Sequence, residues 1–150
     1  MADGKTHLVT GIATGAATAA YTAREQPGID CIAELIGGAL GGAIGGKLPD
    51  VLEPAIHSWH RSTAHSLATA ATLGVTAARS ISSLQDRCRT NALHHEALSE
   101  RAPGELVRVW HRFIAFLWRL LSGVVAGLPA GYISHLALDA CTPRCIPLLG

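Results

Sequence analysis

Residues 36–46 read IGGALGGAIGG, and this glycine-rich run decides how the rest of the chain can pack. Its glycines recur every four residues in two parallel registers, Gly37, Gly41 and Gly45, and Gly38, Gly42 and Gly46. A glycine costs a helix in water about 1 kcal/mol relative to alanine, so a helix built this way needs a packing reason. Small residues four apart allow a neighbouring helix backbone to approach closely. The run therefore predicts a helix in intimate contact with other helices.

A phosphate-cradling loop is the alternative interpretation of this run. The sequence disfavours it, because Gly46-Lys47 is followed by Leu48 and not by the Ser or Thr that ends a P-loop.

Outward from this run, the chain contains four apolar and nearly uncharged segments, at about residues 8–23, 32–46, 62–78 and 113–140. Hydrophobic residues make up 49% of the chain and charged residues 15%, against roughly 25% charged residues in an ordinary soluble domain. None of the segments is an uninterrupted apolar run of about 18 residues, the length typical of a transmembrane helix. The pattern fits a membrane bundle with polar groups inside it or a compact soluble bundle.

Residues 79–112 differ in character, because they carry ten charged side chains, whereas the four apolar segments are nearly uncharged. We expect this polar excursion to hold one or two exposed amphipathic helices. No alternation typical of β-strands occurs along the chain. We therefore predict a single domain, residues 1–150, with an all-α fold: a compact bundle of about four core helices plus the polar helical excursion.

Charge and aromatic residues bear on the partners of the chain. The formal net charge is +1, which provides no electrostatic argument for a nucleic-acid partner. Trp110 and Trp118 lie beside Arg108, Arg112 and Arg119 at one end of an apolar segment, a combination typical of anchors at a membrane surface. We expect a protein of the inner membrane in contact with membrane lipid, with a cytoplasmic location as the alternative. The pattern leaves open whether the chain forms a homo-oligomer.

Several His and Asp side chains are embedded in these apolar segments, where burial costs free energy unless each finds a partner. A shared metal ion is the most economical partner. His135 and Asp139 are four residues apart, which places them on one face of a helix. A further helix is expected to begin near Ser62. His60 lies just before this helix, and His65 lies in its first turn.

Two further candidates lie earlier in the chain. Asp50 follows Pro49, where the glycine-rich helix must end, and His7 lies near the start of the first helix. Each residue also has an ordinary interpretation as a hydrogen-bonded or surface side chain, but the set is more convincing than its members. The other histidines, His57, His94, His95 and His111, are expected to be surface residues.

Imidazole and carboxylate ligands together suit zinc, with manganese or iron as alternatives. Two carboxylates and four imidazoles exceed one tetrahedral site and suggest two ions, so we expect one or two. A metal pair can clamp the attacking and leaving oxygens in phosphoester hydrolysis, with bound water as the nucleophile. We expect the metal site to lie between the helices.

The order of these motifs resembles a known family. Thr6-His7 is followed by the glycine-rich helix leading into Leu48-Pro49-Asp50, then by HRSTAHS at residues 60–66, and finally by GYISHLALDACTPRCIPL at residues 131–148. This series resembles the YdjM-like family of bacterial inner-membrane, metal-dependent hydrolases. The His and Asp order is similar, more distantly, to that of zinc-dependent phospholipase C and related nucleases.

The resemblance implies a set of metal ligands: His7, Asp50, His60, His65, His135 and Asp139. It also implies a catalytic set of Asp50, His60, Arg61 and Arg144, in which the arginines bind a phosphate or carboxylate in bidentate fashion. The function implied is a membrane-associated hydrolase of a small phosphoester or a phospholipid. The alternative is a non-catalytic membrane or interaction protein with a structural metal site.

Overall fold

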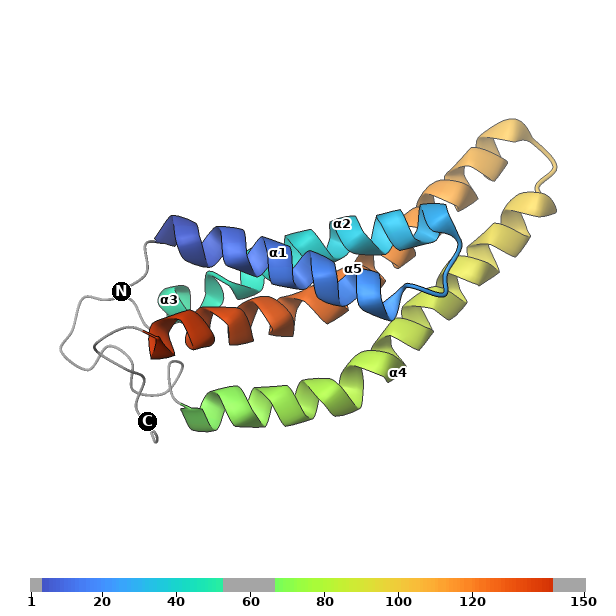
Figure 1. Ribbon diagram of the computed structural model, residues 1–150. Helices are drawn as coiled ribbons and strands as arrows, with labels where there is room; N and C mark the ends of the chain where they lie inside the picture. The colour runs from blue at the N-terminus through green and yellow to red at the C-terminus, as the bar shows by residue number, and fades with distance from the viewer. Residues whose placement is uncertain (1–3, 53–66, 142–150) are drawn as a thin grey trace.

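A computed structural model gives the fold of residues 4–52 and 67–141, and every regular element within these ranges is a helix (Figure 1). The helices are α1 (Gly4–Thr22), α2 (Gly28–Gly45), the short α3 (Leu48–Leu52), α4 (Leu67–Glu100) and α5 (Glu105–Ala140). The four long helices form a bundle in which α2 packs on α1 and α5, and α4 packs on α5. The predicted all-α helical bundle is confirmed.

The polar excursion at residues 79–112 is not a separate element. It consists of the second part of α4 and the first part of α5, joined by a short turn at Pro103-Gly104. No proline interrupts α4 before this turn, so the helix continues from the apolar segment into the polar one. The resulting hairpin projects past α1 and α2 (Figure 1), which explains why its sequence is more polar.

The glycine-rich run forms α2, and its two registers face different neighbours. Gly41 faces α5, where an added Cβ would lie 2.6 Å from the carbonyl oxygen of Val124. Gly42 faces α1, where an added Cβ would overlap the carbonyl oxygen of Gly11 and lie 3.0 Å from the Cα of Gly15. The backbones of three helices are therefore in direct contact, as the spacing predicts.

Small residues fill the interior of the bundle, and large apolar residues cover its outside. Buried positions include Ala19, Ala33 and Ala126. By contrast, α2 exposes Ile32 and Ile44, each 54% accessible. A water-soluble bundle would bury these side chains, whereas lipid tails accept them without cost.

Two stretches, Gly28–Leu52 and Glu105–Ala140, are long and apolar enough to cross a membrane. Pro129 does not break the second stretch, because α5 continues through it.

A layer of buried ionic and polar groups connects the helices where the hairpin leaves the bundle. The Arg89 guanidinium on α4 donates to both carboxylate oxygens of Glu34 on α2, at 2.8 and 2.7 Å, and to the carbonyl oxygen of Thr22 at 3.0 Å. The hydrogen bonds to Glu34 raise the pKa of Arg89. Glu34 is fully buried, so this pairing offsets the cost of removing its carboxylate from water.

A second ionic group in the same layer involves Arg119 of α5. It pairs with Asp30 of α2 at 3.0 Å and donates to the side-chain oxygen of Gln26 at 2.8 Å. The isolated charge that interrupts the last apolar segment therefore faces the interior of the bundle, as charged groups within membrane proteins do.

Candidate metal centre

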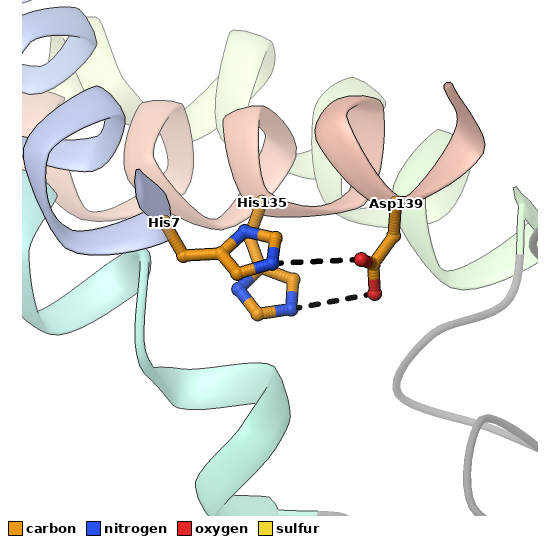
Figure 2. A group of neighbouring side chains, drawn as sticks. All are labelled: His7, His135 and Asp139. Carbon is orange, nitrogen blue, oxygen red and sulfur yellow. Dashed lines mark ion pairs between the residues drawn. The ribbon is translucent and has the colours of Figure 1, made fainter. Parts of the chain in front are cut away.

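His7, His135 and Asp139 meet at the end of the bundle opposite the hairpin (Figure 2). His7 comes from the first turns of α1, and the other two lie one turn apart near the end of α5. One ligand atom from each residue lies within 4.8 Å of the others. All three residues are at most 2% exposed. Two distant segments of the sequence thus contribute to one buried group.

The carboxylate of Asp139 faces both imidazoles. Its Oδ1 lies 3.5 Å from Nε2 of His7, and its Oδ2 lies 3.8 Å from Nε2 of His135 (Figure 2). The two rings stack with centroids 3.8 Å apart and an interplanar angle of 20°. Stacking aligns the two Nε2 atoms on the same side, toward the carboxylate.

The glycine-rich helix orients His135. The Nδ1 of its ring lies 2.7 Å from the carbonyl oxygen of Gly46. A carbonyl oxygen can only accept, so Nδ1 carries the hydrogen and donates it. In the neutral ring Nε2 then bears the lone pair. A hydrogen bond of this kind commonly fixes the ring of a metal-binding histidine.

Because Gly46 has no side chain, the backbone of His7 can also approach it closely. An added Cβ at Gly46 would lie 2.8 Å from the backbone oxygen of His7. The Nδ1 of His7 is buried and has no hydrogen-bond partner within residues 4–52 and 67–141.

Asp50 approaches the group from α3. Its Oδ1 lies 3.6 Å from Nε2 of His135. Its side chain is 39% exposed, whereas those of the other three residues are at most 3% exposed. Asp50 therefore marks the side from which solvent reaches the group.

The arrangement fits a divalent ion. Ligand atoms around a tetrahedral zinc ion, at bond lengths of about 2.0–2.1 Å, lie about 3.3 Å from one another. In this structure, Nε2 of His7 lies 3.5 Å from Oδ1 of Asp139 and Nε2 of His135 lies 3.8 Å from Oδ2, and one ligand atom of each residue lies within 4.8 Å of the others. A small inward movement of the three side chains would give the spacing around a zinc ion. Two imidazoles with one carboxylate are also a donor set that zinc accepts. Such an ion would be held by His7, His135 and Asp139, which leaves the fourth position for water on the side of Asp50.

The structure brings together four of the predicted ligands, which are His7, Asp50, His135 and Asp139. The remaining predicted site residues lie outside the described ranges; they are His60, Arg61, His65 and Arg144. Sequence reasoning missed the Gly46 carbonyl as the group that orients His135. Its place at the end of the glycine-rich run, three residues before Pro49, was the available signal.

The histidines expected at the surface differ in their exposure, and His57 lies outside the described ranges. His95 and His111 are half-buried and face each other between α4 and α5, with their Nδ1 atoms 3.0 Å apart. His94 is exposed, as expected.

Comparison with known proteins supports the resemblance at the level of the family. The sequence profile of the YdjM inner membrane protein family matches residues 1–150, the whole chain. No significant match was found among curated proteins or among solved structures. The two apolar helical stretches and the exposed isoleucines of α2 agree with the membrane setting in the family's description. The chain belongs to the YdjM inner membrane protein family.

Proposed function

We propose that this inner membrane protein is a metal-dependent hydrolase of phosphoesters, and that a divalent ion, zinc in the first instance, binds between α1, α3 and α5. The single observation that supports it best is the convergence of His7, His135 and Asp139 in a buried position. Burying a carboxylate and two imidazoles without a cation or protons to bind them is costly.

A divalent ion held there supplies Lewis acidity, which lowers the pKa of a bound water and polarises a phosphoryl oxygen. The protein's own groups have separate tasks. Asp139 contacts both imidazoles and keeps their Nε2 atoms converged. The Gly46 carbonyl holds the ring of His135 in one orientation. We assign Asp50 the task of accepting a proton from the attacking water, because it is the exposed carboxylate of the group.

An apolar groove beside the metal centre supports a lipid as the substrate. It measures about 510 Å³ and lies between α1 and α5, where Thr10, Thr14, Ile133 and Leu138 contribute to its walls. The hydroxyl of Thr14 donates to the carbonyl oxygen of Thr10 at 2.8 Å. An apolar ligand in the groove would therefore not leave this donor without a hydrogen bond. Thr10 is one turn from His7, and Leu138 precedes Asp139. An acyl chain in the groove would bring a phosphoester head group toward the metal centre.

The alternative function is a structural metal site in a non-catalytic membrane protein. The nearly complete burial of His7, His135 and Asp139 favours it, because structural sites are closed to solvent. The exposure of Asp50 favours the hydrolase. Predicted roles for His60, His65, Arg61 and Arg144 remain part of the hydrolase proposal.

Metal content is the first test. We expect protein purified in detergent without chelator to contain at least one equivalent of metal, and chelation to lower its melting temperature. The Asp139→Asn variant should lose the metal and the response to chelator. Asp86, exposed on α4 far from the centre, provides the matched control Asp86→Asn, which should behave as wild type.

Hydrolysis is the second test. Metal-loaded protein should hydrolyse an activated phosphodiester, and phospholipid in mixed micelles faster, with both rates lost in Asp139→Asn and Asp50→Asn. Substoichiometric metal with no thermal response to added zinc would refute the metal site itself. A fully loaded protein that hydrolyses neither substrate would leave the structural site as the function.

A further inference from the structure

The hairpin formed by α4 and α5 carries a second group of nitrogen ligands, far from the metal centre. His95 on α4 and His111 on α5 lie opposite each other, eight residues on either side of Pro103. Their ring centroids are 5.3 Å apart, with an interplanar angle of 31°. Their Nδ1 atoms approach to 3.0 Å. Both residues are half-buried, so solvent reaches the pair.

We propose that His95 and His111 form a second metal site, which binds a divalent transition-metal ion through both Nδ1 atoms and joins the two helices of the hairpin. The proposal is independent of the hydrolase function. Water would occupy the remaining coordination positions.

The distance between the two nitrogens favours a particular class of ion. With metal–nitrogen bonds of about 2.05 Å, the observed 3.0 Å separation subtends an angle of about 95° at the ion. This is close to the right angle between neighbouring ligands in square-planar or octahedral complexes. Nickel(II) and copper(II) prefer such arrangements and accept imidazole.

The protonation of His95 also suits a metal ion. Burial, followed by the effects of His111 and His94, lowers the pKa of His95. Its ring is therefore neutral at pH 7, as metal binding requires. His94 lies edge-on to His95, with centroids 5.6 Å apart and an interplanar angle of 73°. It is exposed and stands outside the pair, which makes it a natural control.

The competing explanation is a hydrogen bond between two neutral imidazoles. In that case one Nδ1 donates to the other, and the pair only adds a polar contact to the hairpin. Such a bond also has a length near 3.0 Å, so metal titration must distinguish the two explanations.

The experiment uses the full chain in detergent, after chelator treatment, with Asp139→Asn and His135→Gln introduced to disable the metal centre. Nickel(II) binding is measured by calorimetry. We expect His95→Gln or His111→Gln in this background to lower the affinity at least tenfold or to abolish one binding event. His94→Gln should leave the binding unchanged. Equal nickel binding by all three variants, or none in the background protein, would overturn the proposal.

A measurement on the wild-type protein guards against variants that fail to fold. Histidine modification by diethyl pyrocarbonate, followed by mass spectrometry, reports the accessibility of each ring. Nickel(II) should protect His95 and His111 but not His94. Equal modification of His95 and His111 with and without nickel would also overturn the proposal.

Discussion

Replacing Gly42 by alanine tests whether direct backbone contact between α1 and α2 holds the bundle together. The new Cβ would overlap the carbonyl oxygen of Gly11 and lie 3.0 Å from the Cα of Gly15. Carbon atoms normally approach to about 3.5–4.0 Å. No side-chain rotation can relieve the overlap, because both neighbours are backbone atoms. The two helices must therefore move apart.

The size of the effect follows from two opposing contributions. Overpacking of this kind costs about 2–3 kcal/mol, the upper part of the usual range, because the backbone itself must shift. Alanine recovers up to about 1 kcal/mol relative to glycine through its better helix propensity. The expected net loss in the free energy of unfolding is about 1–2 kcal/mol.

Gly74 of α4 provides a control with the same chemical change. The atom nearest to its added Cβ is Cδ1 of Ile133, at the ordinary contact distance of 3.9 Å. The Gly74→Ala substitution should therefore raise the free energy of unfolding by about 0.5–1 kcal/mol. The two substitutions are expected to change the free energy of unfolding in opposite directions.

Thermal unfolding in a mild detergent, followed by circular dichroism, measures both variants. Gly42→Ala should lower the melting temperature by roughly 2–8 °C, and Gly74→Ala should raise it by roughly 1–4 °C. Metal affinity should fall only in Gly42→Ala, because displacement of α1 moves His7 away from His135. If Gly42→Ala is as stable as the wild type, the argument from close helix contact is wrong.

Two further predictions concern buried and titrating groups. Arg89→Met should destabilise the protein by about 3–5 kcal/mol, because it leaves the charge of Glu34 buried without its counterion. Arg24→Met, which breaks the exposed pair with Glu25, should cost less than about 1 kcal/mol, and thermal unfolding compares the two. The pKa of His95 is lowered from 6.5 by folding, so the unfolded chain binds a proton more readily than the folded protein. The free energy of unfolding is therefore unaffected by His95 well above pH 6.5 and decreases as the pH falls below this value. With chelator present, the melting temperature should fall between pH 7.5 and 5 less steeply in His95→Gln than in wild type; equal slopes would contradict the assignment.

Local spacing indicated which residues of α2 face its neighbours and which residues of α5 share a face. The four-residue recurrence of Gly37, Gly41 and Gly45 indicated a helix with a close neighbour, since only such contact offsets the low helix propensity of glycine. The same helical period placed His135 and Asp139 on one face. Both features depend only on the geometry of a single helix, and the structure confirms the glycine contacts.

The ends of the helices were harder to predict from the sequence than their contacting faces. Polar composition suggested a separate excursion at residues 79–112, whereas α4 and α5 each run through the change in polarity. Polarity reports which surroundings a helix has along its length, and it does not report where the helix ends. The only strong helix-ending signal in that region is Pro103-Gly104.

Pairing between distant segments was decided by the tertiary structure alone. The sequence by itself determined that the chain is helical, that α2 must touch other backbones, and that His and Asp residues in apolar segments need a partner. It did not determine that Glu34 pairs with Arg89, that His95 faces His111, or that His7 stacks on His135. The physical reason is that these contacts depend on how far each helix is shifted along its neighbours. That shift is set by the summed packing of whole helices, including the glycine contacts between α1, α2 and α5, and no local pattern encodes it.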